Sequence, residues 1–306
     1  MNTAPILVLG YNRPDYLKRL LEFLKSEEIA NLYISIDGPK EGNPEDKILV
    51  KKCRELAIEA QSWSNAELFF SDSNYGCYLG VTKAIDWFFK NVEFGIILED
   101  DLVFDATTIN FLTKGLLEFM ERMDIGSVCA YSHASPYSIS DEPISTIMSS
   151  YPSSWGWATW ANRWVKVERD FSNYPLPLFL YRSLKYGGIS GTRTWLQIRK
   201  RLELGKLDSW AYRWLLTHSR YDWKAVVPSR SLVTNIGFRA DATHTKHVKE
   251  IVGVPDFTNQ ESKPQINFKM NLDRKYNKFL LRNVYGIIPI RIKLKEKIKS
   301  IYLVKQ

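Results

Sequence analysis

The sequence has few cysteines and no long apolar run, and each shortage excludes a class of protein. Its 306 residues include only Cys53, Cys77 and Cys129, an odd set without the spacing of a metal site. A secreted disulfide framework uses an even set, so we expect a reducing compartment. No apolar stretch reaches the ~20 residues of a membrane span, and no basic leader precedes the first apolar run. The sequence therefore predicts a cytosolic protein without an integral membrane segment.

Internal repeats, low-complexity tracts and recognised nucleic-acid motifs are missing as well. The remaining composition, 25% charged and 45% hydrophobic, excludes collagen, coiled coil and disorder and supports a sizeable core. The 42 Lys and Arg against 34 Asp and Glu leave a net charge of +8, which favours anionic partners such as nucleotides, nucleic acid or membrane lipid. Because the basic residues are spread along the chain, a nucleic-acid partner is not predicted.

The first half of the chain alternates short runs of branched apolar residues with helical periodicity. This alternation predicts an α/β protein with a parallel sheet flanked by helices. Strands are predicted at 6–9, 32–36, 67–70, 95–98 and 127–131. One helix is predicted to begin at Pro14, and two more are predicted at 78–91 and 107–123. After about residue 132 Ser, Pro, Trp and Tyr dominate, and the later predicted elements are helices near 194–206 and 208–218 and strands at 224–227 and 231–238.

Polar residues follow three of the predicted strands. Glu99, Asp100 and Asp101 end one strand, Arg13 follows the first, and Asp37 follows the second. Ligands of open parallel sheets bind at the carboxyl ends of strands, and hard oxygen ligands suit Mg²⁺ or Mn²⁺. Each cluster taken separately has an ordinary explanation. The three acids could solvate a strand end, Arg13 could be a surface residue, and Asp37 could belong to an Asp-Gly turn. Their conjunction favours a site for a metal and a phosphate ligand.

Six stretches resemble the nucleotide-sugar glycosyltransferases of the GT-A fold, a Rossmann-like mixed sheet with flanking helices. The pattern is similar to N-acetylglucosaminyltransferase I and to bacterial surface-polysaccharide relatives, in family order over roughly residues 4 to 245. The stretches are Pro5–Pro14, Ser35–Gly38, Asn74–Phe88, Ile96–Leu102, Ser154–Trp160 and Val233–His244. The acidic triplet and the Trp-Gly-Trp segment are the specific parts of this resemblance.

The resemblance implies a role for each residue of the donor site. Arg13 corresponds to the arginine on the diphosphate, Asp37 to the acid on the uracil edge, Asn74 to a further base contact, and Lys83 to a phosphate contact. Glu99 and Asp100 are expected to touch ribose and nucleotide or to hold the waters of the metal. Asp101 is the expected ligand of Mn²⁺ (or Mg²⁺), and His244 resembles the histidine that completes the site. His244 could equally be a surface residue, and His247 is close enough to compete.

Asp208 is the candidate catalytic base, in the region where the eukaryotic enzyme has a Trp-Asp-Asp-Trp run. This sequence offers one acid there in place of two. The alternative is that Asp208 caps the helix that follows it. Glu168 and Asp170 are the next acids to consider.

Trp155, Gly156 and Trp157 are the candidate sugar platform, because aromatic faces complement the apolar faces of pyranose rings. Gly156 would let the backbone come close. The alternative is an aromatic core packed under a loop, and Trp160 belongs to the same run.

The resulting prediction is a metal-dependent inverting transferase that moves sugar from a UDP-sugar to a glycan or lipid-linked glycan acceptor, as in bacterial surface-polysaccharide synthesis. A nucleotidyltransferase that forms nucleotide sugars would normally carry a glycine-rich loop after the first strand, where this chain has Tyr11-Asn12-Arg13-Pro14. A non-catalytic sugar-binding protein would explain the tryptophans but not the acids. We expect a catalytic domain over 1–250, with a nucleotide-sugar half (1–105) and an acceptor half (106–250).

The remaining residues, 251–306, are expected to form a C-terminal extension. Residues 287–305 interleave basic and apolar side chains, and both strand and helix periods fit parts of the run. A basic amphipathic segment can lie at an anionic membrane surface. The resemblance to bacterial relatives that extend lipid-linked glycans implies that this surface is the inner face of the cytoplasmic membrane. Packing of the same segment on the catalytic domain is the alternative.

Overall fold

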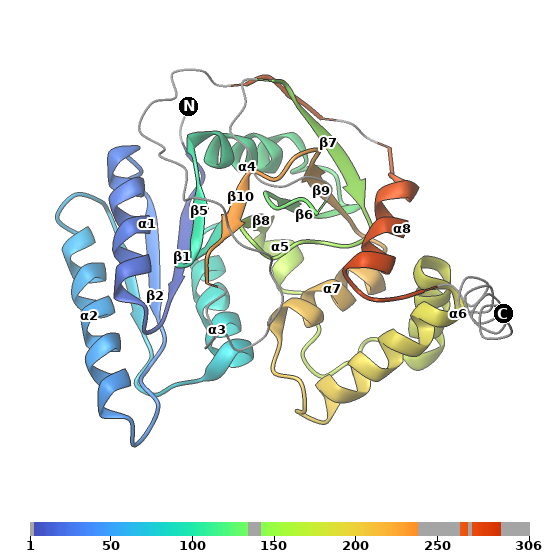
Figure 1. Cartoon of the computed structure of the whole chain (residues 1–306), viewed down its shortest axis with the longest axis horizontal. Coiled ribbons are helices and arrows are strands. Elements are labelled where there is room, and N and C mark those ends of the chain that lie inside the picture. Colours follow the sequence, from blue (N-terminus) through green and yellow to red (C-terminus); the bar gives the residue numbers. More distant parts are fainter. Residues whose placement is uncertain (1–2, 134–141, 238–263, 269–270, 289–306) are drawn as a thin grey trace, which may run out of the picture.

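The computed structural model describes residues 3–133, 142–237, 264–268 and 271–288. Within these ranges nine strands form one mixed sheet, in the order β11-β7-β9-β6-β8-β4-β1-β2-β3 (Figure 1). The strands are β1 (Ile6–Gly10), β2 (Leu32–Ile36), β3 (Glu67–Phe70), β4 (Phe94–Glu99), β6 (Ile125–Cys129), β7 (Ile144–Ser149), β8 (Trp157–Trp160), β9 (Lys224–Pro228) and β11 (Ile266–Asn267). The predicted α/β class is therefore confirmed.

The two ends of the sheet differ in strand direction. At one end β3, β2, β1 and β4 run parallel, and Leu9 is paired with both Ser35 and Glu99. β8 runs antiparallel to β4 and to β6 and so joins this parallel block to the rest of the sheet. Because one sheet crosses the predicted boundary at residue 105, the two predicted halves share hydrogen-bonded strands.

Side chains alternate along the strands and build a core on each face of the sheet. Ile6 and Val8 belong to one buried cluster, and Leu7 and Leu9 belong to the other. The first face is covered by α1 (Pro14–Ser26), α2 (Pro44–Ala60) and α4 (Ala106–Glu118). The second is covered by α3 (Gly76–Asn91), α5 (Ala161–Trp164), α6 (Leu176–Glu203), α7 (Trp210–Tyr221) and α8 (Arg274–Asn283).

A short ribbon stands apart from the main sheet, where β5 (Leu102–Phe104) pairs antiparallel with β10 (Val233–Asn235). β5 directly follows the acidic triplet, so this pairing brings residues 235–237 beside those acids. No helix in the described residues combines the length and apolar character needed to cross a bilayer.

Candidate functional site

The predicted strand-end groups meet at one edge of the parallel block. β1 lies between β2 and β4, so Arg13, Asp37 and the acidic triplet leave three adjacent strands at their carboxyl ends. The Arg13 guanidinium donates from Nη1 to Asp101 Oδ2 at 3.0 Å. The structure thus joins the residue predicted for diphosphate to the residue predicted for metal.

Two further residues close on Asp101 from the β5–β10 ribbon. Asn235, which is buried, donates from Nδ2 to Asp101 Oδ1 at 3.0 Å, and the Gly237 backbone N–H donates to Asn235 Oδ1 at 2.7 Å. A Cβ at Gly237 would collide with the Asp101 carboxylate. Asn235 and Gly237 were not predicted as site residues, although they lie in a stretch that carries the family resemblance.

The three carboxylates of the acidic triplet are unfavourable in their charged form, because they are buried and lie close together. Burial, followed by repulsion from Asp101, raises the pKa of Glu99 to about 8 and that of Asp100 to about 7, and Arg13 opposes both shifts. Burial also raises the pKa of Asp101. Buried carboxylates that repel one another are typical of sites that bind a cation or donors supplied by a ligand.

A second arginine, Arg19 of α1, faces the same acids. The Arg13 and Arg19 guanidiniums lie 5.7 and 5.5 Å from the ring centroid of Tyr16. The charges of Asp101 and Asp100 act on Arg19, and among the described residues its buried Nη2 atom has no hydrogen-bond partner. Arg19 therefore adds positive charge to the site with one donor still unused.

Asp37 and Asn74, the two predicted base contacts, touch each other. Asn74 Nδ2 donates to Asp37 Oδ2 at 3.1 Å and to the Gly38 carbonyl at 3.1 Å. The backbone N–H groups of Tyr75 and Gly76 also donate to Asp37. Burial raises the pKa of Asp37, and these backbone donors counteract the shift.

Asp208 binds the first turn of α3. Its Oδ2 accepts from the Cys77 N–H at 3.1 Å and its Oδ1 from the Tyr78 N–H at 3.0 Å. The prediction that Asp208 caps the helix after it is wrong, since the Ser209 side chain caps α7 by accepting from Tyr212 N. Asp37 and Asp208 together satisfy four consecutive backbone N–H groups that a helix start leaves without intrahelical partners.

The predicted aromatic platform and the predicted phosphate-binding lysine lie in different environments. Trp157 is 1% exposed and stacks on Trp210 at 5.4 Å between ring centroids, so no sugar reaches it and the platform prediction is wrong for this residue. Trp155 is only partly buried, and its ring packs edge-to-face with that of Tyr131, 4.4 Å apart between ring centroids. Gly156 adopts a φ of +60°, which favours glycine, and a Cβ there would meet only ordinary contacts. Exposed Lys83 stacks its ammonium on the Tyr75 ring, 3.3 Å from the centroid.

The other acids and histidines do not join the site in the described ranges. Glu168 is buried in an ion pair with Arg220 at 2.6 Å, and Asp170 accepts within its own turn from Ser172. His244 and His247 lie outside the described residues. No group of three His, Cys, Asp or Glu side chains that could hold a metal occurs in the part of the chain that is described.

Asp46 of α2 was also not predicted, and it fixes the loop after β1. Tyr11 Oη and Asn12 Nδ2 each donate to its carboxylate at 2.6 Å, and the Lys40 N–H donates at 2.7 Å. The helix that holds Asp46 was not predicted, although Asn43-Pro44 is a helix start signal that could have indicated it. Its long-range partners have no local signal.

The site and fold define an α/β protein whose polar centre lies at the carboxyl edge of parallel strands. No protein-family model and no curated protein matches the chain. A crystal structure of HddC from Yersinia pseudotuberculosis is similar in part, with 14% identity and a TM-score of 0.24. The match covers 47% of this chain and 59% of that one, and it carries no argument about fold or activity.

Proposed function

We propose that the chain is a GT-A glycosyltransferase that transfers sugar, with inversion, from a UDP-sugar to a glycan or lipid-linked glycan acceptor. The observation that carries this proposal is the convergence of Arg13, the Asp37–Asn74 pair and the Glu99–Asp101 triplet on one sheet edge. A nucleotide diphosphate needs a polar contact for its base and positive charge for its phosphates. This edge offers both.

The donor half of the reaction is assigned to groups that are already positioned. Asp37 and Asn74 lie side by side, and a carboxylate next to an amide suits the edge of a uracil. Because the Asn74 amide already donates to Asp37 and to the Gly38 carbonyl, the base would replace one of these two bonds. Arg13 and Arg19 offer guanidiniums on the same side of α1 as the acids, and guanidinium groups match phosphate oxygens in geometry. During transfer these cations would stabilise the negative charge that develops on the leaving diphosphate.

A divalent cation, Mn²⁺ or Mg²⁺, is part of the proposal. The side chains present suit such a cation, because the acidic triplet provides hard oxygen ligands and a cation would relieve the repulsion between its carboxylates. Asp101, with His244, would hold it, and one of the present partners of Asp101 would give way, since Arg13 and Asn235 engage both carboxylate oxygens. The cation would supply charge neutralisation for the diphosphate.

Asp208 remains our candidate for the carboxylate that accepts the acceptor hydroxyl proton. It is exposed at the start of α3, next to Cys77, and the charges of Glu99 and Asp208 both act on the Cys77 thiol. Both carboxylates therefore lie within electrostatic range of the same thiol. The bonds of Asp208 to Cys77 and Tyr78 would hold its carboxylate in one orientation.

The test is a panel of nucleotide sugars with the purified protein and Mn²⁺, read by thermal shift and by release of nucleoside diphosphate. We expect UDP-sugars to raise Tm and to be hydrolysed slowly, and we expect Asn74→Ala to weaken both effects. Glu67→Ala, on β3, is the matched control. If no nucleotide sugar binds, or if the protein instead forms nucleotide sugar and pyrophosphate from UTP and a sugar phosphate, the proposal is wrong.

A further inference from the structure

Helix α6 is bent into two arms that leave apolar side chains uncovered. Gly188 has a φ of +61° and a ψ of −167°, so the helical backbone is broken there. Leu184 before the bend is 53% exposed and Ile189 after it is 69% exposed. Leu176, Leu180 and Tyr181 of the first arm are also exposed. Single exposed apolar residues are ordinary, but a contiguous group marks an interaction site.

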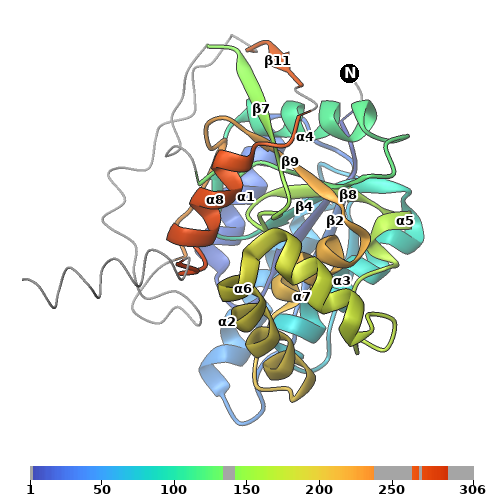
Figure 2. The same cartoon turned by 90° about the vertical axis from the view of Figure 1, so that its right-hand side faces the viewer.

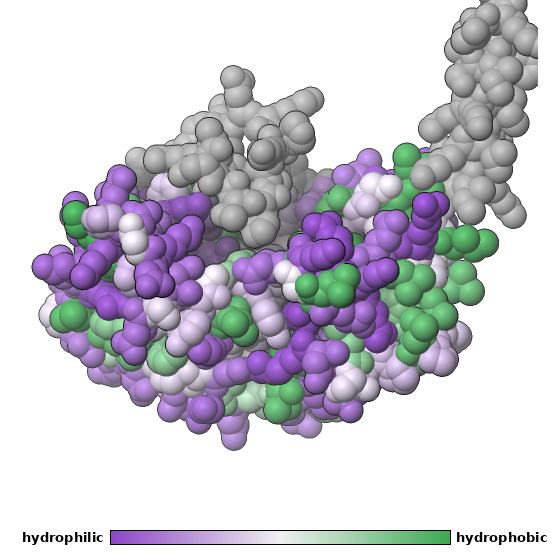
Figure 3. Space-filling model, turned by 90° about the horizontal axis from the view of Figure 1, so that it is seen from below, coloured by the Kyte–Doolittle hydropathy of each residue, from purple (hydrophilic) through white to green (hydrophobic). Residues whose placement is uncertain are grey.

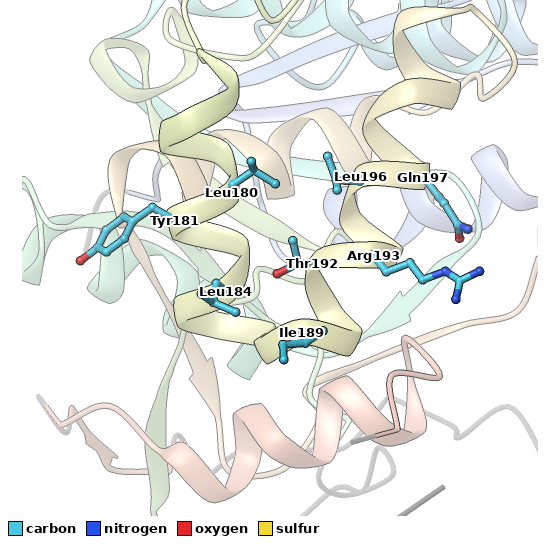
Figure 4. Close-up of a pocket in the computed structure, with 8 residues that line it drawn as sticks. All are labelled: Leu180, Tyr181, Leu184, Ile189, Thr192, Arg193, Leu196 and Gln197. Atoms are coloured by element: carbon cyan, nitrogen blue, oxygen red, sulfur yellow. The ribbon is translucent and has the colours of Figure 1, made fainter. Parts of the chain in front are cut away.

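The two arms enclose a groove of about 520 Å³. Leu180 and Leu184 point into it from the first arm and Leu196 from the second, with Ile189 at the bend (Figure 4). Seen from below, hydrophobic side chains gather toward the right-hand end of the molecule, the end where Figure 1 shows α6 (Figure 3). We call these residues, with Leu176 and Tyr181, the α6 patch.

Basic residues are concentrated in the segment that carries the α6 patch and in the C-terminal segment. Residues 176–206 contain seven Lys or Arg and one acid, and residues 274–306 contain ten Lys or Arg and one acid. Arg193 lines the groove itself, whereas Arg182 and Lys185 pair with Asp222. These two segments hold 17 of the 42 basic residues and 2 of the 34 acidic ones, so the remainder of the chain is net negative. The expectation that basic residues are spread along the chain is therefore wrong.

The second basic segment lies against the first. α8 packs beside α6 (Figure 2), the Tyr285 ring lies 5.0 Å from that of Trp195, and a Cβ at Gly191 would lie 3.8 Å from Ile287. The described chain ends at Ile288, next to the second arm of α6. Residues 289–306, which carry six of the ten basic residues, lie outside the described residues and continue from this point.

We propose that the α6 patch docks this protein on an anionic lipid surface. A second copy docked through the same face would place positive charge against positive charge. A bilayer with anionic headgroups supplies what this face lacks, namely negative charge at the level of the phosphates and hydrocarbon directly beneath them. An amphipathic helix lies in such an interface with its apolar side chains inserted, and nearby Lys and Arg side chains add electrostatic attraction to the anionic headgroups.

The test uses the full chain and sedimentation with vesicles of phosphatidylcholine alone or with about 30% phosphatidylglycerol. We expect binding only to the anionic vesicles, with release as NaCl rises from about 50 mM to about 500 mM. Leu184→Ser/Ile189→Ser should lower the bound fraction at least about fivefold. The control is Ile48→Ser/Ile58→Ser on α2, which alters residues 57% and 53% exposed at the opposite end of the molecule and should leave binding within about twofold.

Three outcomes would overturn the proposal. The first is equal binding by the α6 variant and the wild-type protein, with binding lost in full-length Lys293→Gln/Lys295→Gln/Lys297→Gln, which would assign lipid binding to the tail alone. The second is no binding to either vesicle, which would favour an acidic protein partner. The third is a dimer that the α6 variant dissociates. Because the assay needs no sugar nucleotide, its outcome does not depend on the proposed activity.

Discussion

Two regions of the sheet, one on each side of β8, treat buried polar groups in opposite ways. Beside β4, Glu99, Asp100 and Asp101 repel one another, and burial raises the pKa of all three. Beside β6, buried His218 is held on both ring nitrogens, at 3.0 Å from Ser127 Oγ and 3.1 Å from the Trp214 carbonyl. A buried polar group with partners specifies structure, whereas a buried group that repels its neighbours points to a ligand.

The aromatic residues follow the same division. Trp157, Trp164 and Trp214 are fully buried and lie within 6.0 Å of one another between ring centroids. These rings pack together on the face of the sheet that α5 and α7 cover, where they stabilise the fold. We therefore expect substitutions near the triplet to reduce activity and substitutions in the tryptophan cluster to reduce stability.

The largest effect should come from Trp214→Ala. Removing a fully buried tryptophan should lower the free energy of unfolding by about 3–5 kcal/mol, because a cavity remains where its neighbours cannot collapse. Trp155→Ala, at a partly exposed ring, should cost less than half as much. Urea denaturation of both variants measures the difference. Equal losses of stability in the two variants would contradict the structural role assigned to the buried tryptophan cluster.

The next effect should be on turnover. Asp101→Ala should reduce sugar transfer at least about a hundredfold, equivalent to about 2.7 kcal/mol of transition-state stabilisation, because the diphosphate charge loses its compensation. The melting temperature should change less than in Trp214→Ala. Asp124→Ala, which breaks an exposed ion pair with Arg122, is the control and should leave both quantities nearly unchanged. Full activity of Asp101→Ala in the presence of EDTA would contradict the proposal that a divalent cation takes part in the transfer.

The pH dependence of stability should report His218. Burial lowers its pKa from 6.5 to about 3, so below about pH 6.5 the unfolded chain binds a proton that the folded protein cannot take up. The contribution of His218 to the free energy of unfolding should therefore fall as pH decreases from 6.5 toward 3, by up to about 1.4 kcal/mol per pH unit. The raised pKa values of Glu99 and Asp100 act in the opposite direction, so the effect of His218 is measured as a difference between two proteins. In chemical denaturation between pH 6 and 4, the plot of stability against pH for His218→Gln should differ in slope from that of the wild-type protein, with less stability lost per pH unit. An unchanged slope would contradict the buried neutral imidazole.

The smallest effect separates capping from catalysis. Asp208→Ala and Ser209→Ala each remove a helix cap and should each cost about 0.5–2 kcal/mol of stability. Only Asp208→Ala should also lose most turnover while donor affinity is kept. If both variants melt lower and turn over alike, Asp208 is a cap and the base lies elsewhere. Thermal melting, initial rates and donor titration on the pair decide this.

Local patterns predicted much of the fold. The strands of the parallel block are short branched runs between helices, and their polar ends follow from strand order, so the meeting of Arg13 with Asp101 was foreseeable. β8 was missed because Trp157–Trp160 is buried on both faces and carries no alternation. The first arm of α6 was missed because Pro177 and the Gly187–Gly188 pair are typical of loops.

The contacts that complete the site were not predictable in the same way. Asn235 reaches Asp101 across 134 residues, and Asp208 reaches Cys77 across 131 residues. Such pairings depend on the tertiary course of the chain, and a single sequence contains no local signal for them. Residue type alone suggested that Asp208 caps a helix, but it could not indicate which one.

The long reach of Asp208 and Asn235 also sets the order in which the site can be completed during synthesis. The β1–β4 segment leaves the ribosome more than a hundred residues before either contact exists. A nascent chain therefore has α3 without the second carboxylate at its first turn, and Asp101 without its amide partner. The cluster of polar groups at the carboxyl edge of the sheet is completed only after β10 has emerged, so a translation product that ends before that strand lacks the Asn235 contact to Asp101.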